Sequence, residues 1–149
     1  MRYQKRPHGF AMIEVLLIIV LLGVAAIFVI PRFIHEDADF HAAITKELGS
    51  SLKANAALAY SIYIEAGKPK DIDMSGNKIA MIYGYPSSTP EGITRTINST
   101  VGFATEYTLY QVRFSAPGVV NPETCHVVYT QSTMVDMPPA VVLNTSDCA

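Results

Sequence analysis

One continuous apolar run near the N-terminus limits what this chain can fold into. From Phe10 to Ile30 the sequence has 21 residues, and Glu14 is the only ionisable side chain among them. A helix of this length, rising about 1.5 Å per residue, matches a bilayer core of about 30 Å. Most of its residues are Ile, Leu, Val or Phe, and their insertion outweighs a carboxylate cost of about 2.5 to 3.5 kcal/mol. The run therefore predicts a transmembrane helix over residues 10–30.

Glu14 needs a partner in such surroundings, because intramembrane acids usually face the protein interior and pair with an opposite charge. No other ionisable side chain in the run can supply one. If the chain were cut between Gly9 and Phe10, the new amino group of Phe10 would lie one helical turn from Glu14. Proteolysis at this point would therefore create the missing cation.

These residues resemble the prepilin signal of type IV pilins and of their relatives in type II secretion and DNA uptake. The likeness rests on a basic leader ending in glycine, then phenylalanine, glutamate four residues later, and an unbroken apolar run. It implies that a membrane aspartyl peptidase cuts after Gly9, that the amine of Phe10 is methylated, and that Glu14 is the acid of the signal. We expect Glu14 to set subunit registration, because its carboxylate can pair with the Phe10 amine of an adjacent subunit in a low-dielectric core. Ala11 and Met12 depart from the family, in which Ser or Thr and then Leu are common.

Pro31 follows the apolar run. Proline has no N–H to donate to the Ile27 carbonyl and its ring crowds that carbonyl, so a kink is expected there within one long helix. Many pilins carry a proline at the matching position. The alternative is a membrane helix that ends at the interface beside Pro31.

Charges around the run predict its orientation. Arg2, Lys5 and Arg6 precede it, and acidic residues follow soon after its end. Because Lys and Arg favour the cytoplasmic side, the leader (residues 1–9) is expected in the cytoplasm and the body outside the inner membrane. A cleaved secretory signal is the alternative, although its apolar core is usually about 7 to 15 residues long.

The rest of the chain divides into a helical part and a strand-rich part. Residues 31–66 place apolar side chains mostly at four-residue steps, which predicts an amphipathic continuation of the helix ending before Gly67 and Pro69. Residues 67–149 are expected to form a globular β domain. Its strand-like runs cover residues 78–83, 93–97, 107–114, 125–129 and 140–143. Together they predict an α+β fold, with an antiparallel sheet of about four strands packed on the helix. The resemblance implies the type IV pilin fold.

Cys125 and Cys148 are the only cysteines. On the oxidising side of a membrane, two cysteines in one small domain are expected to form a disulfide, and two unpaired thiols are the alternative. The resemblance implies the same bond, because many type IV pilins close a C-terminal loop in this way. Three segments are also similar to the mannose-sensitive haemagglutinin pilins, namely Gly67-Lys68-Pro69, Ile79-Ala80-Met81 and Gly84-Tyr85-Pro86.

Residues that resemble metal sites have simpler explanations. His35, Glu36 and Asp39 approximate a zinc motif, but the next histidine, His41, is six residues from His35, away from a one-turn spacing. A solvated helix surface is expected instead.

Asp71, Asp73, Ser75 and Gly76 resemble the start of a calcium loop, but Ile82 stands where a bidentate glutamate is required. A turn is expected there, with bound calcium as the alternative. Two glycosylation patterns, Asn98-Ser99-Thr100 and Asn144-Thr145-Ser146, are short and common by chance.

The resemblance implies a structural subunit of a type IV pilus, made as a prepilin and polymerised for adhesion or motility. Its expected partners are a prepilin peptidase and N-methyltransferase, other copies of itself and related pilins, an inner-membrane assembly platform, and the bilayer before assembly. The alternatives are a pseudopilin of type II secretion or DNA uptake, and a single-pass anchored binding protein that does not polymerise. A net charge of −2 gives no support for nucleic-acid binding. No catalytic residue, cofactor or metal is predicted.

Overall fold

The chain has an α+β fold, which confirms the predicted class. The computed structural model describes residues 12–97 and 102–149, apart from the side chains of residue 23 and residues 25–36. Two compact units are present, Met1–Glu36 (the N-terminal unit) and Asp37–Ala149 (the globular unit), and helix α1 (Met12–Glu65) contributes residues to both. The predicted leader and the bond between Gly9 and Phe10 lie outside the described residues.

Helix α1 ends at Glu65, one residue before the predicted end. The Gly67 N–H donates to the Ile64 carbonyl at 3.2 Å, and the Lys68 N–H donates to the Tyr63 carbonyl at 2.9 Å. This is the hydrogen-bond pattern of a Schellman cap, in which the residue after the last helical turn is left-handed. Gly67 takes that position with φ of 80°, a conformation that glycine adopts without a Cβ clash.

Pro31 lies inside α1, so the helical backbone continues past it instead of ending there. The side chain of Pro31 is outside the described residues. Because proline lacks an N–H, the hydrogen bond to the carbonyl of residue 27 is missing whatever the local bend. The kink at Pro31 stays a prediction.

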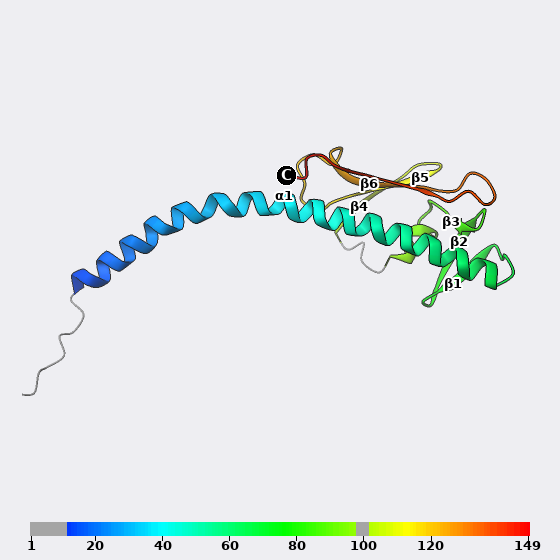
Figure 1. The fold of residues 1–149 in the computed structure, drawn as a ribbon, viewed down its shortest axis with the longest axis horizontal. Coiled ribbons are helices and arrows are strands. Elements are labelled where there is room, and N and C mark those ends of the chain that lie inside the picture. The colour runs from blue at the N-terminus through cyan, green and yellow to red at the C-terminus, as the bar shows by residue number, and fades with distance from the viewer. Residues whose placement is uncertain (1–11, 98–101) are drawn as a thin grey trace, which may run out of the picture. The chain divides into compact units, whose positions relative to one another are not determined.

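The globular unit contains two antiparallel sheets, where one had been predicted (Figure 1). A three-stranded sheet has the order β1-β2-β3, and a four-stranded sheet has the order β4-β5-β6-β7. Their strands are β1 (Asp71–Met74), β2 (Asn77–Ile82), β3 (Tyr85–Pro86), β4 (Ala104–Tyr107), β5 (Gln111–Ser115), β6 (Cys125–Thr130) and β7 (Ala140–Thr145). The predicted strands over residues 78–83, 125–129 and 140–143 correspond to β2, β6 and β7.

Residues 93–97, predicted as a strand, instead contain a short 3₁₀ helix, η1 (Ile93–Thr96). Residues three apart share a face of a 3₁₀ helix, and Ile93 and Thr96 are both buried. The Thr96 hydroxyl donates to the Ile93 carbonyl at 2.7 Å, so the buried hydroxyl is satisfied within the turn. Alternation along a strand would have put these two side chains on opposite faces.

The single strand predicted over residues 107–114 is two strands, β4 and β5, joined by a turn. The Thr108 N–H donates to the Gln111 carbonyl at 2.8 Å, which closes this turn. Leu109 and Tyr110 occupy its tip and are exposed. Apolar residues at a loop tip made the sequence look like a continuous strand.

The core of the globular unit lies between the C-terminal part of α1 and the sheets. Leu48, Leu52 and Ala56 of α1 pack against inward-facing side chains of β5 and β6, and Ala59 packs against the β1–β2 hairpin. Gly49 lets β7 approach the helix, because a Cβ at this position would stand 2.8 Å from a methyl carbon of Leu143. The remaining members of the main core cluster are Ile93, Ile97, Val112, Phe114, Val127 and Tyr129.

Candidate functional site

The described part of the N-terminal unit is an apolar helix without protein cover. Its large apolar side chains are 45% to 90% exposed, and Glu14 is exposed in the first turn. These side chains are Met12, Ile13, Val15, Leu16, Leu17, Ile18, Ile19, Val20, Leu21, Leu22 and Val24. They are consecutive except for Glu14 and Gly23, so they surround the helix and form no single stripe. Such a surface is unfavourable in water and requires another apolar phase or partner.

The predicted processing site cannot be placed against this helix, since Gly9 and Phe10 lie outside the described residues. Of Gly9, Phe10 and Glu14, only Glu14 has a described side chain. Among the described residues, no helix is long and apolar enough to cross a membrane. The predicted span over residues 10–30 includes positions 10 and 11 and the side chains of residues 25–30, which fall outside that description.

The second candidate site is the C-terminal segment, which a disulfide ties to the sheet. Cys125 opens β6 and Cys148 follows β7, and the two are bonded with Cα atoms 4.9 Å apart. Both cysteines are buried in a small cluster against Ala42 and Ile44 of α1. The predicted pairing is confirmed, and the alternative of two unpaired thiols is wrong.

Two polar residues of the same stretch of α1 also contact this disulfide and the C-terminal segment. His41 Nδ1 lies 3.0 Å from the Cys148 carbonyl, and because a carbonyl can only accept, Nδ1 carries the proton. The Thr45 hydroxyl donates to the His41 carbonyl at 2.7 Å and lies 3.6 Å from Cys125 Sγ. His41, considered above as a distant zinc ligand, therefore fastens the C-terminal segment to the helix.

Removing the disulfide should destabilise the globular unit substantially. A Cys125→Ser, Cys148→Ser double variant should lose about 3 kcal/mol of unfolding free energy, because a covalent link between residues 23 positions apart no longer restricts the unfolded chain. Thermal unfolding of oxidised wild type, reduced wild type and the double variant measures this. Since the chain has only these two cysteines, the reductant acts on this bond alone. Equal midpoints for the three samples would contradict the stabilising role.

The residues that resemble a calcium loop form the β1–β2 hairpin. Ser75 and Gly76 make its two-residue turn, both with positive φ, as hairpin turns of this length require. Asp73 Oδ1 accepts the Gly76 N–H at 3.1 Å, and Asp71 lies 3.5 Å from Lys78 Nζ. Within the residues that the structure describes, no three His, Cys, Asp or Glu side chains gather as metal ligands would. The expected turn is confirmed at Ser75 and Gly76, whereas Asp71 and Asp73 lie in strand β1.

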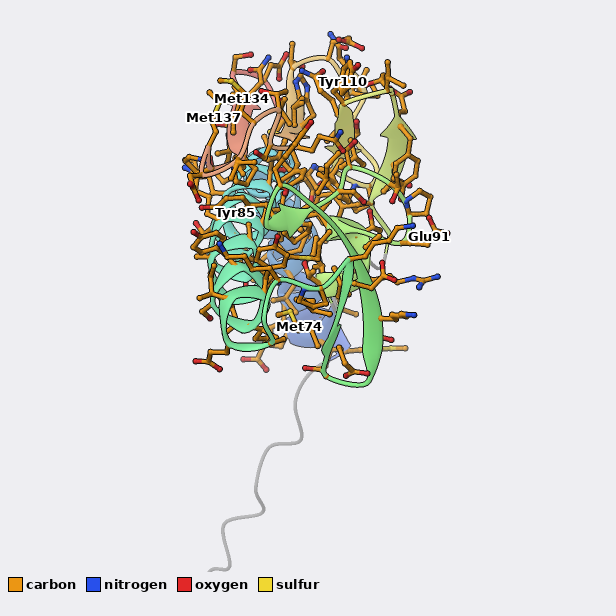
Figure 2. The ribbon with its side chains drawn as sticks, turned by 90° about the vertical axis from the view of Figure 1, so that its right-hand side faces the viewer. Met74, Tyr85, Glu91, Tyr110, Met134 and Met137 are labelled. Carbon is orange, nitrogen blue, oxygen red and sulfur yellow. A yellow bond between two sulfur atoms is a disulfide. The ribbon has the colours of Figure 1, made fainter. Side chains whose placement is uncertain are left out.

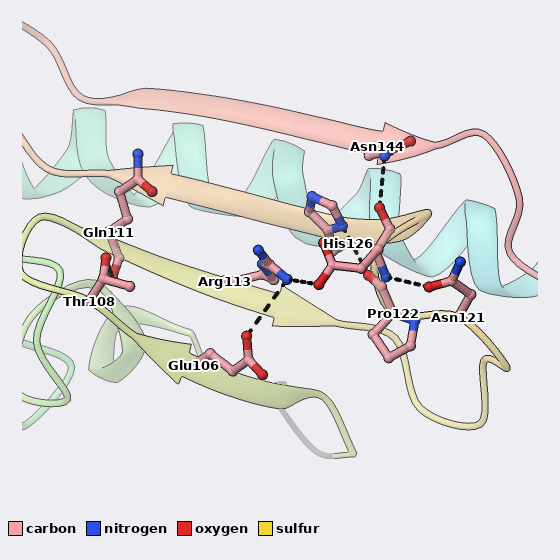
Figure 3. A network of polar contacts seen from close by, with 9 residues as sticks. Glu106, Thr108, Gln111, Arg113, Asn121, Pro122, His126 and Asn144 are labelled. Atoms are coloured by element: carbon pink, nitrogen blue, oxygen red, sulfur yellow. Dashed lines mark hydrogen bonds and ion pairs between the residues drawn. The ribbon is translucent and has the colours of Figure 1, made fainter.

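A polar network covers part of the outer face of the four-stranded sheet (Figure 3). Arg113 on β5 makes ion pairs with Glu106 on β4 and with Glu123 in the loop before β6. His126 Nδ1 donates to the Pro122 carbonyl at 3.0 Å, so this imidazole braces the same loop. Exposed ion pairs contribute little, typically about 0–1 kcal/mol each. The network orders a loop and brings together no nucleophile.

The side chain of Asn144, which begins one of the two glycosylation patterns, already makes hydrogen bonds within the protein. Asn144 Nδ2 donates to the Glu123 carbonyl at 2.9 Å, and its Oδ1 accepts from the Ser146 N–H and hydroxyl at 3.2 and 2.8 Å. A glycan on Nδ2 would have to replace the first of these bonds. The other pattern begins at Asn98, which lies outside the described residues.

Tyr129 on β6 links the two sheets through a buried hydrogen bond. Its hydroxyl donates to the Pro86 carbonyl in β3 at 2.7 Å. Burial raises the pKa of Tyr129 above its ordinary value, and the nearby Tyr85 adds to this rise. The pKa of Tyr85 is raised as well, first by burial and then by Tyr60 and Asp136.

Tyr129→Phe should lower the unfolding free energy at neutral pH by about 1 to 3 kcal/mol, because the buried Pro86 carbonyl loses its donor. The raised pKa also predicts alkaline sensitivity. The folded state prefers the protonated hydroxyl, so this contribution is complete below about pH 10 and is lost as the pH rises further. Denaturant unfolding at about pH 8 and pH 11 should therefore show a larger alkaline loss for wild type than for Tyr129→Phe. Equal losses would contradict this assignment.

No family model, curated protein or solved structure matches this chain. Its function therefore has to be inferred from its own residues and geometry.

Proposed function

We propose that this chain is a structural subunit of a type IV pilus, made as a prepilin, cleaved after Gly9, methylated at Phe10 and polymerised into a surface filament. The observation that carries the proposal is the exposed helix from Met12 to Val24, which is apolar on every side and carries one charge, Glu14. A helix of this kind needs an apolar environment at every stage of its life. A membrane, followed by the core of a filament, supplies one.

The globular unit supports a pilin over a pseudopilin. Its α+β fold places two sheets along the C-terminal part of α1, and a disulfide closes the C-terminal segment. A disulfide-closed C-terminal loop is the feature that the pilin resemblance implies and that secretion pseudopilins more often lack. The buried position of this bond against α1 fits a domain that must stay folded outside the cell.

Assembly then follows from the chemistry of the apolar helix. In the membrane its side chains contact lipid, and in a filament neighbouring copies cover the same side chains. Extraction therefore exposes little apolar surface to water, where each large side chain would cost roughly 1.5 to 3 kcal/mol. Glu14 pairs with the Phe10 amine of an adjacent subunit. Only the correct offset between two subunits along the filament axis brings these two charges together.

The proposal assigns partners and a location. The basic leader with Arg2, Lys5 and Arg6 stays in the cytoplasm, and the globular unit faces away from it across the inner membrane. The prepilin peptidase and N-methyltransferase, an assembly platform, and other pilin copies act on or join the subunit there. After assembly the protein resides in an extracellular pilus.

Deletion of the gene in the source organism tests the proposal. Electron microscopy should show loss of surface fibres, and immunogold labelling with antibody to the globular unit should decorate wild-type fibres along their length. Secreted enzymes should still leave the periplasm. Intact fibres together with trapped secreted enzymes would contradict the pilin assignment and favour a pseudopilin. Unchanged fibres and unchanged secretion would leave only an anchored protein that does not polymerise.

A further inference from the structure

In the globular unit, helix α1 carries a surface pocket on each side of its buried stripe. The stripe contains Leu48, Leu52 and Ala56, which pack into the core. Figure 2 looks nearly along this part of the helix and shows Tyr85 beside it. The pockets have volumes of about 290 and 280 Å³. Because an α-helix has about 3.6 residues per turn, the helix residues that line them lie on two different flanks. These residues include Phe40, Glu47 and Ser51 for the first pocket, and Lys53, Ala57 and Tyr60 for the second.

Each pocket has one charged residue in its lining, and the two charges are opposite. Glu47 is exposed at the first pocket, and Lys53 is exposed at the second. Lys46, about two turns before Lys53, is exposed on the same flank as Lys53. None of these three side chains forms an ion pair with another described residue. We call the side of Glu47 the acidic flank and the side of Lys53 the basic flank.

Large apolar side chains are exposed beside these charges. Leu58 is 50% exposed and lies about three turns after Glu47, so it belongs to the acidic flank. Ile64 is 43% exposed and lies about three turns after Lys53, so it belongs to the basic flank. Each flank therefore combines a free charge with an exposed apolar residue, which is typical of a protein interaction surface.

One spacing relates the two flanks. Lys53 follows Glu47 by six residues, and Ile64 follows Leu58 by six residues. Two parallel copies of α1 that are shifted by six residues, or about 9 Å, therefore place both pairs side by side. An antiparallel arrangement cannot match both pairs, because the charged and apolar residues follow each other in the same direction on each flank.

The same shift agrees with two further pairs of positions. It places Phe40, which is 59% exposed, beside Lys46, and a lysine over an aromatic ring is a favourable contact. It also places Ser51 beside Ala57, and these small side chains let two helices approach closely. A second copy of this chain thus fits both flanks in charge, in apolar surface and in size.

We propose that neighbouring subunits of the filament pack in parallel through these two flanks, with Glu47 of one copy paired with Lys53 of the next and Leu58 packed on Ile64. This contact rests on the proposed polymerisation, in which every copy leaves the same membrane in the same orientation. The acidic flank of each copy meets the basic flank of another, so the interface is heterologous and can extend along a filament without closing.

Crosslinking between full-length copies tests the contact. Ser51→Cys and Ala57→Cys are placed in separate copies that are expressed together, which leaves both charges in place. The native cysteines are bonded to each other and buried, so a short bismaleimide reacts with the new thiols. Surface fibres from the mixed cells should give crosslinked dimers on a denaturing gel, whereas fibres from either variant alone should give monomers.

Dimers from Ala57→Cys alone would show that the basic flank meets itself, and mixed fibres without dimers would show that neighbours meet elsewhere. Either result would overturn this contact and leave the pilin assignment intact. Absence of fibres from wild type would overturn the pilin assignment and this contact with it.

Reversing the charges tests the pairing itself. Lys53→Glu and Glu47→Lys should each lower the yield of sheared fibres at least about tenfold, because like charges then face each other at every contact. Both changes in one chain restore opposite charges and should return the yield to within about twofold of wild type. Lys70→Glu reverses an exposed charge outside α1 and should assemble as wild type does. Wild-type yield from either single reversal, or no recovery in the double variant, would overturn the inference.

Discussion

Gly9→Val should leave the chain uncleaved and abolish surface fibres. A peptidase that accepts glycine before the cut must bring backbone close to its catalytic acids, and a β-branched side chain both fills that space and restricts the local backbone. Without the cut no amine forms at Phe10, so Glu14 stays unpaired. Immunoblots of membrane fractions should show only the larger precursor, and electron microscopy should show no fibres.

The matched control for this experiment is Arg6→Lys, which changes the leader but keeps its charge and its glycine. It should be processed and should assemble as wild type does. Two results would contradict the account. One is a shortened product from Gly9→Val, and the other is normal fibres built from the uncut precursor.

Glu14→Gln should produce a correctly cleaved subunit that assembles poorly. The amide keeps the shape of the side chain but removes the charge, which leaves the neighbouring Phe10 ammonium unpaired in an apolar core. Breaking a buried ion pair on one side costs about 3 to 5 kcal/mol, which corresponds to a loss in the association constant of roughly 10² to nearly 10⁴. Sheared surface fractions should contain almost no pilin, although the membrane contains normal amounts.

Glu65→Gln provides the control for charge loss, because Glu65 is exposed at the other end of α1. It should assemble normally. Wild-type fibre yield from Glu14→Gln would show that the acid has no part in registration. Failure of Glu14→Gln to be cleaved at all would place Glu14 in peptidase recognition instead.

The sequence predicted correctly the helix end and the strand that depend on neighbouring residues in the chain. The Gly67 cap ended α1 within one residue of its predicted end, and β6 has the regular alternation of buried and half-buried residues that a strand on a helix requires. β1 was missed because Asp71 and Asp73 are poor strand formers. It forms because Ile72 reaches a buried cluster with Ala59 and Ile79, a contact that no local window contains.

The candidate sites also divide into a part that the sequence could predict and a part that depends on contacts between distant residues. Cys125 and Cys148 could be paired from their number and expected compartment alone. The contact of His41 with Cys148 joins residues 107 positions apart, and that of Gln131 with Ser88 joins residues 43 apart. A single histidine and a single glutamine form no recognisable pattern in the sequence, so only the folded structure reveals their hydrogen-bond partners.

Mass spectrometry of the N-terminal peptide from purified surface fibres tests the central claim most directly. The account predicts that the chain in those fibres begins at Phe10 and carries a methyl group on its α-amine. A chain that begins at Met1 in intact fibres, or at any residue other than Phe10, would contradict it.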